Sequence, residues 1–345
     1  MKNHLKQIAA LTVCLVMLLS LAACGGSVPD LLDGGANRFA AGKTEDDYSL
    51  HNSGELLQSM LDQYSGSYQV PDSTRMDDDA YDDAKKKADE DDPQPPSGET
   101  GPGATDDTIL VGSWDELLDA FYGAYYRTDE YLEFTLTGGF QVDLHEALQE
   151  SYNELQRRDP VFVCSVKQWS WGSRGSDYII EISYNMDIDE INRIKSETES
   201  YVEEALEKIR DSSMSDYEIV CAVNDYLCDT IYYPQSEPYA PVTHTAYGAL
   251  ADGVAVCEGY ACAAKLLLDA LGIPCDIQFG TCNNGGGHAW NLVQLEGQWY
   301  QMDVTWNDGS LSRSDYLLVT DDYMRMSRSW DTSDYPACAD EPYAP

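Results

Sequence analysis

The chain has few basic residues: 21 lysines and arginines stand against 61 aspartates and glutamates among 345 residues, a formal net charge of −40. Nucleic-acid binding needs a cationic surface that meets the phosphates, so unaided binding to nucleic acid is excluded. The same charge argues against electrostatic binding to anionic lipid. The paired Cys-x-x-Cys and His-x-x-His spacings that typify zinc sites are also missing. We expect no metal and no cofactor.

After residue 23 the sequence has no apolar run of the ~20 residues that a membrane-spanning helix needs. Residues 1–23 differ, because Lys2 and Lys6 precede an apolar run over 8–23, a pattern typical of a signal peptide. The run ends in Leu21-Ala22-Ala23-Cys24, which resembles the bacterial lipobox, so Cys24 is predicted to be lipidated. An ordinary signal peptide followed by an incidental cysteine is the alternative. Acyl chains would hold the protein at the extracytoplasmic face of the cell membrane.

Residues 24–107 have the composition of a disordered tether. Within them, Asp72–Asp92 combines a high density of carboxylates with few apolar side chains, and a Pro- and Gly-rich stretch follows. Such a segment buries too little apolar surface to offset the entropy of ordering. Charge repulsion and prolines keep it extended.

Residues 108–188 are predicted to form a small α+β domain without a catalytic constellation. Ser113 is a helix cap with Glu116 at the capping-box position, and a Gly/Ser turn separates two strands. The expected helices and strands are Ser113–Tyr126, Tyr131–Thr137, Asp143–Arg157, Val161–Trp171 and Asp177–Asn185.

Residues 189–345 begin with two predicted helices, Asp189–Arg210 and Asp216–Ile231. A third covers Cys257–Leu271 and ends at Gly272. Cys257 therefore lies in the first turn, where the helix dipole and the free amides favour a thiolate. The alternative is a buried structural cysteine. His244, in the loop before this helix, is expected at the surface.

A β-hairpin is predicted from residue 285 to Trp306, with its turn at Glu296-Gly297. With a two-residue turn, Trp290 pairs with Asp303, and His288 pairs with Thr305. His288 and Asp303 then lie diagonally on one face, within side-chain reach. A three-residue turn would place them on opposite faces. The three glycines before His288 leave its approach free of side chains.

A cysteine, a histidine and a carboxylate in this arrangement form a nucleophilic triad. Asp303 would fix the orientation and tautomer of the His288 imidazole, which would take the proton of the Cys257 thiol and return it to the leaving group. Trp290 and Trp306 would wall the site and could contact substrate. Zinc binding by the three residues is the alternative, against which the missing ligand spacings argue.

Four segments carry a resemblance to the transglutaminase-like superfamily: 247–250, Val256-Cys257-Glu258-Gly259-Tyr260-Ala261, His288-Ala289-Trp290-Asn291, and 299–308 with its Asp303-Val304-Thr305-Trp306. The similar region spans about 190–325. The resemblance implies an α+β, papain-like core with an antiparallel sheet. It assigns the nucleophile to Cys257, the base to His288 and the orienting acid to Asp303. The superfamily includes protein cross-linkers, cysteine peptidases, amidases and inactive members.

These features predict a lipid-anchored, extracytoplasmic protein that acts on protein or peptide carboxamides through a thioester. An amine acceptor gives cross-linking, and water gives proteolysis or deamidation; the sequence does not choose between them. Cell-wall peptides and surface proteins are the expected substrate classes, on the basis of location alone. The alternatives are a non-catalytic binding or assembly module with the same fold, and an enzyme whose 108–188 domain presents substrate.

Overall fold

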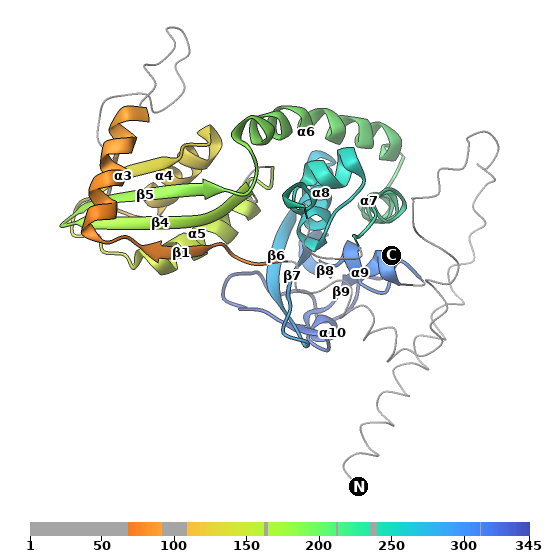
Figure 1. Cartoon of the computed structure of the whole chain (residues 1–345). Coiled ribbons are helices and arrows are strands. Elements are labelled where there is room, and N and C mark those ends of the chain that lie inside the picture. The colour runs from red at the N-terminus through yellow and green to blue at the C-terminus, as the bar shows by residue number, and fades with distance from the viewer. Residues whose placement is uncertain (1–67, 92–108, 162–164, 212, 235–239, 311) are drawn as a thin grey trace. The chain divides into compact units, whose positions relative to one another are not determined.

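The structure is a computed structural model that describes residues 68–91, 109–161, 165–211, 213–234, 240–310 and 312–345 (Figure 1). Its described residues form an α+β fold with two five-stranded sheets. The strand order is β1-β4-β5-β3-β2 in the first sheet and β10-β6-β7-β8-β9 in the second. The pairs within the second sheet are antiparallel, which confirms the predicted fold class. None of the helices in the described ranges is both long and apolar enough to cross a membrane.

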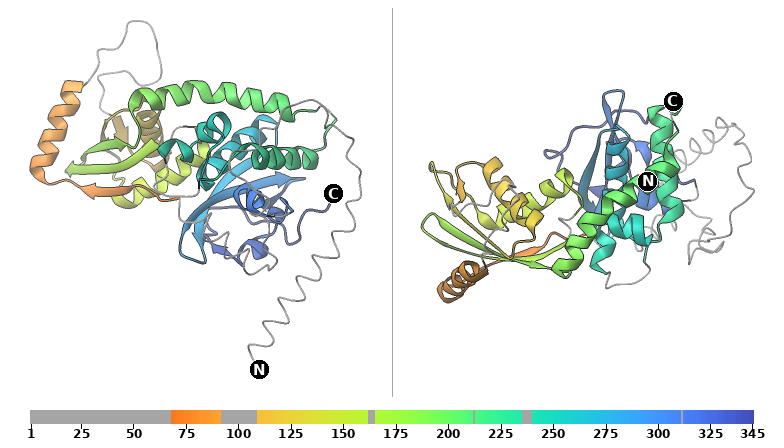
Figure 2. Two further views of the ribbon diagram at one scale, coloured as in Figure 1. Left: turned by 45° about the vertical axis from the view of Figure 1, so that its right-hand side comes forward. Right: turned by 90° about the horizontal axis from the view of Figure 1, so that it is seen from above.

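The first sheet is covered by helices on both faces. Its strands are β1 (Asp72–Arg75), β2 (Ile109–Val111), β3 (Tyr131–Leu136), β4 (Val166–Arg174) and β5 (Asp177–Tyr184), and its helices are α3 (Asp78–Asp91), α4 (Trp114–Arg127) and α5 (Leu144–Arg158). Side chains alternate along β5, so Ile179 packs under α3 and Ile180 joins the main core on the other face. Figure 2 shows α3, in orange, apart from α4 and α5, in yellow, with the sheet between them.

The prediction of a disordered tether over 24–107 is wrong for residues 68–91. β1 pairs in parallel with β4, with Asp72 opposite Gln168. In α3, Tyr81 and Ala84 lie three positions apart on one face and are buried against Ile179. Arg174 stacks on the Tyr81 ring at 4.5 Å and pairs with Asp82 at 2.6 Å. The average composition of the segment concealed this small apolar face. Cys24, residues 24–67 and 92–107 lie outside the described residues.

The second sheet lies beside three helices. The elements are α6 (Ile188–Ile209), α7 (Asp216–Thr230), η3 (Pro241–His244), η4 (Gly248–Asp252), α8 (Cys257–Ala270), β6 (Cys275–Cys282), β7 (Gly287–Leu295), β8 (Gln298–Met302), α9 (Val304–Gly309), β9 (Leu317–Val319), α10 (Asp321–Met324) and β10 (Arg328–Ser329). The helices expected from the sequence are present within one or two residues of their predicted ends. Ser215 and Glu218 form a capping box at α7.

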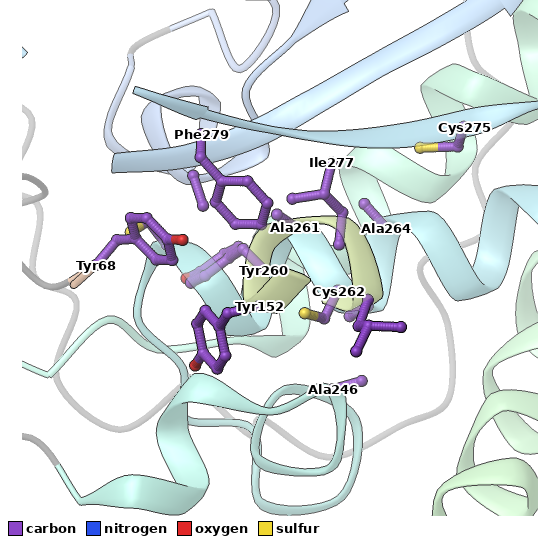
Figure 3. Close-up of a cluster of buried hydrophobic side chains, with 14 of the residues drawn as sticks. Tyr68, Tyr152, Ala246, Tyr260, Ala261, Cys262, Ala264, Cys275, Ile277 and Phe279 are labelled. Carbon is purple, nitrogen blue, oxygen red and sulfur yellow. The ribbon is translucent and has the colours of Figure 1, made fainter. Parts of the chain in front are cut away.

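Helix α8 is the centre of this half. It packs against β6 and β7, and it also contacts α6 and α7. Figure 3 shows Ile277 and Phe279 of β6 pointing toward Ala261 and Ala264 of α8. The small side chains of α8 allow this close packing, and the amide of Asn291 on β7 donates to the carbonyl of Ala261 at 2.9 Å. The helix that begins at Cys257 is thereby fixed on the strand that carries His288.

The hairpin register is the predicted one, but its second strand is shorter than expected. Leu295 pairs with Gln298, and Asn291 pairs with Met302. Glu296 and Gly297 both have positive φ angles, 51° and 79°, as a two-residue type I′ turn requires. The expected pairings of Trp290 with Asp303 and of His288 with Thr305 do not form. Asp303 instead caps α9, because its side chain accepts the backbone N–H of Trp306, and the chain leaves the ladder.

Candidate active site

Cys257 is the first residue of α8 and is fully buried. The loop before it is held close to the helix, since the amide of Val256 donates to the carbonyl of Thr243 at 3.0 Å. Gly259 makes this approach possible, because a Cβ there would lie 2.5 Å from the same carbonyl oxygen. The sulfur therefore stands at the N-terminal end of a helix, where the dipole favours a thiolate.

His288 and Asp303 are in direct contact. Nε2 of the imidazole lies 2.8 Å from Oδ2 of the carboxylate, and both side chains are fully buried. The other oxygen, Oδ1, accepts the amide of Trp306 at 3.1 Å. One carboxylate oxygen thus begins α9 while the other holds the imidazole. The predicted neighbourhood of the two residues is confirmed, although Asp303 reaches His288 from a helix cap and not from a strand.

This hydrogen bond determines which imidazole nitrogen can act as a base. An ionised carboxylate only accepts, so Nε2 carries the proton that it donates to Asp303. In the neutral ring Nδ1 is then the acceptor. Within the proposed triad, the side chains of His288 and Asp303 are in direct contact. Cys257 is held in position as the first residue of helix α8.

Arg328 is a third partner of this pair and was not predicted from the sequence. Its side chain is fully buried, and its guanidinium forms an ion pair with Oδ2 of Asp303. Burial would raise the pKa of Asp303, but the charges of His288 and Arg328 and their hydrogen bonds outweigh burial and lower it to about 2. No sequence motif surrounds Arg328, so no local signal could have identified it.

Trp290 and Trp306 enclose the imidazole. Their ring centroids each lie 5.7 Å from that of His288, and both tryptophans are buried. The indole N–H of Trp290 donates to the Gln301 side chain at 2.6 Å. The predicted wall is therefore present, whereas contact of these tryptophans with substrate stays a prediction.

Glu258, the residue after Cys257, forms a second polar cluster. Its carboxylate is buried, lies 2.7 Å from Nδ1 of His244 and accepts a hydrogen bond from the Gln156 amide. The expectation of a surface histidine at position 244 is met only in part, because 20% of its side chain is exposed and its ring pairs with this buried carboxylate. Gln156 belongs to α5, so the first sheet's helices contact the start of α8.

One of the three glycines before His288 is in close contact with a segment far away in the sequence. A Cβ on Gly287 would lie 2.2 Å from the carbonyl oxygen of Tyr68, so the backbone at Tyr68 occupies that space. The Tyr68 ring stacks on Phe279 at 4.6 Å, and Figure 3 shows the two rings side by side. Its hydroxyl donates to Asn153. A segment from the expected tether is thus packed against the residue that precedes the proposed base.

Across the part of the chain that the structure describes, no three His, Cys, Asp or Glu side chains gather as a metal ion would need. The zinc alternative for Cys257, His288 and Asp303 therefore gains no support from their positions.

Residues 203–304 match the family model described as the transglutaminase-like superfamily. The matched span contains Cys257, His288 and Asp303. A comparison with curated proteins found no match.

Three solved structures are similar over part of the chain. A crystal structure of a TGase is 12% identical with a TM-score of 0.28, over 57% of this chain and 59% of that one. A proposed cysteine protease from Cytophaga hutchinsonii is 15% identical with a TM-score of 0.28, over 40% and 61%. A proposed protease from Parabacteroides distasonis is 14% identical with a TM-score of 0.26, over 36% and 28%. The chain spans about three fifths of the first two structures, and TM-scores this low carry no argument about function.

Proposed function

We propose that this chain, which carries a domain of the transglutaminase-like superfamily, is a cysteine enzyme that transfers acyl groups from protein or peptide carboxamides through a thioester. The observation that carries the proposal is the buried 2.8 Å contact between Nε2 of His288 and Oδ2 of Asp303. It orients an imidazole on the strand against which the helix of Cys257 packs. A nucleophile, a base and an orienting acid are the parts that acyl transfer requires.

The reaction would proceed in two halves. Nδ1 of His288 takes the thiol proton, and the thiolate of Cys257 attacks the carboxamide carbon. The carbon–nitrogen bond then breaks, the imidazolium gives its proton to the departing nitrogen, and a thioester remains on the sulfur. An incoming amine or water loses a proton to His288 and attacks the thioester, which releases the thiol. An amine gives a new amide, and water gives a carboxylic acid.

We further propose that the enzyme works at the extracytoplasmic face of the membrane, on surface proteins or cell-wall peptides. The support is the sequence of residues 1–24, with its basic start, apolar run and Cys24 after two alanines. Metabolic labelling with a fatty-acid analogue tests it. Full-length protein should take up the label, and Cys24→Ser should not.

Reaction with iodoacetamide near neutral pH tests the activated sulfur. Burial raises the pKa values of Cys221 and Cys338, so these more exposed thiols are slow internal references. Cys257 should be alkylated faster than both although it is buried, and His288→Ala should slow it. Cys262→Ala, on the same helix and equally buried, should leave the fast reaction in place. Equal rates with and without His288 would favour the non-catalytic binding module.

The products identify the acceptor. The full chain is incubated with a glutamine peptide and a tagged amine, and the mixture is analysed by mass spectrometry. A tagged adduct indicates transfer to an amine, a shortened peptide indicates proteolysis, and a mass gain of about one unit indicates deamidation. Absence of all three, together with a slow Cys257, would overturn the proposal.

A further inference from the structure

Arg328 occupies an unusual position for an arginine, because its charged end is inside the molecule. It lies on β10 opposite Cys282 of β6. Its guanidinium carbon is 3.9 Å from the ring centre of Trp306 and 5.0 Å from that of Trp290, the same two rings that enclose His288. Its Nε also lies 3.2 Å from the hydroxyl of Ser327. Burying a cation is unfavourable unless it is paired, and the paired anion here is Asp303.

The carboxylate oxygen Oδ2 of Asp303 accepts from both Nε2 of His288 and Nη1 of Arg328. Two donors of different chemistry therefore share one oxygen in a water-excluded site. We infer that Arg328 is a positioning residue for the proposed reaction, which holds Asp303 ionised and limits its attraction for the imidazolium form of His288. This inference rests on the proposed function.

The chemical consequence concerns the leaving group. When Cys257 transfers its proton, the imidazolium that forms lies beside a carboxylate already neutralised by a guanidinium. The imidazolium is then less stabilised than beside an isolated carboxylate. It is a stronger acid for that reason, and a stronger acid protonates the departing nitrogen more readily. While the ring is neutral, Arg328 keeps Asp303 charged, so the tautomer that leaves Nδ1 as the base is retained.

The other ionisable groups near this cluster come from several elements. Burial raises the pKa of Tyr316, and it raises that of Tyr323 to about 12, so both phenols stay neutral at the pH values of the test. Helix α8, which packs against the strand of His288, carries Cys257, and α9, which begins after Asp303, carries Asp308. Cys282 on β6 lies opposite Arg328. The carboxylate of Asp315 acts on both phenols. Among the described residues in this set, Arg328 is the cation that the Asp303 carboxylate contacts.

The test is an NMR titration of His288 in the full chain, with histidine isotope labelling and assignment by His288→Gln. In Arg328→Met the midpoint of the His288 titration should rise by about one pH unit. The charge of Asp303 would then stabilise the imidazolium without a guanidinium to offset it. Arg328→Lys keeps the charge, and its midpoint should stay near that of the wild type. The acidic limb of activity, which reports the neutral imidazole that the reaction needs as a base, should move in the same direction as the midpoint in each variant.

Arg157→Met is the matched control. Arg157 is partly buried and pairs with Asp276 on β6. The variant therefore loses an ion pair elsewhere in the protein and should leave the midpoint of the His288 titration unchanged. Circular dichroism verifies folding, and Arg328→Gln replaces the methionine variant if that variant is unfolded. An unchanged midpoint in a folded, uncharged variant overturns the inference. The titration needs no turnover, so it separates this outcome from a failure of the proposed function, which would appear as a slow Cys257 in the wild type.

Discussion

The carbonyl oxygen of Tyr68 lies against the α-carbon of Gly287, the residue before the proposed base. A methyl group at position 287 would come within 2.2 Å of that oxygen, closer than any van der Waals contact permits. The segment that begins at Tyr68 and the strand of His288 therefore pack closely against each other, and the glycine at position 287 makes this contact possible.

Gly287→Ala should destabilise the protein by about 1–3 kcal/mol, because the backbone at Tyr68 must move. Urea unfolding followed by tryptophan fluorescence measures the loss. Gly123→Ala is the control, since a Cβ there meets only the flexible end of Arg127 on α4, and alanine in a helix should be neutral or stabilising. A Gly287→Ala variant as stable as the wild type would show that the Tyr68 contact is not maintained in solution.

Asp303→Asn should reduce kcat/KM by about 10³–10⁴-fold, as loss of the orienting carboxylate does in Ser-His-Asp enzymes. The asparagine amide can donate to Nε2, and the ring then adopts the tautomer in which Nδ1 carries a proton and cannot act as the base. Stability should also fall by about 3–5 kcal/mol, because Arg328 is left as an unpaired buried charge.

The double variant Asp303→Asn with Arg328→Met separates these two effects. It should regain part of the stability in urea unfolding, because the buried cation is removed with its partner. It should not regain activity. Recovery of activity in the double variant would contradict the assignment of Asp303 as the orienting acid.

The titration of Asp303 should be confined to acidic pH. Its pKa in the folded protein is about 2, below the ordinary value of about 3.9. A lowered folded pKa means that the ionised form stabilises the fold above about pH 4, and that this contribution is lost as the pH falls toward 2. The carboxyl carbon of Asp303, assigned by Asp303→Asn, should show no NMR shift change from titration of its own proton between pH 7 and 4. A midpoint above 4 would contradict the assigned role of Arg328.

Tyr81→Ala should release α3 from the first sheet. Tyr81 is buried and packs on Ile179, so its loss should cost about 2 kcal/mol locally. Limited trypsin digestion should then cleave faster at the lysines 85–87 of this helix. Asp79→Ala, at an exposed position of α3, should leave the cleavage rate unchanged. Equal and rapid cleavage of the wild type would instead favour the tether that composition alone predicts.

Much of the site was predictable because it depends on local rules. The pair Glu296-Gly297 selects a two-residue turn, and that turn fixes which residues of the hairpin can meet. Gly272 ends the helix that begins at Cys257. These local signals are sufficient to predict that His288 lies next to Asp303.

What escaped prediction depends on contacts between distant segments. Arg328 lies 25 positions after Asp303, and Tyr68 lies more than 200 positions before Gly287; neither is in a periodic pattern that identifies its partner. His244 pairs with the buried Glu258, which no local pattern indicates. The prediction of disorder for residues 68–91 was wrong because the average composition of an acidic segment does not reveal a short apolar face on one helix.

The sequence by itself therefore determined the turns, the helix ends and the spacing that joins an imidazole to a carboxylate, since backbone geometry alone relates neighbouring positions. Only the tertiary structure decided that this carboxylate is shared with a buried arginine and that the segment beginning at Tyr68 packs against the residue before the proposed base. Those contacts follow from burial and charge pairing among segments far apart in the chain, and no local periodicity encodes them.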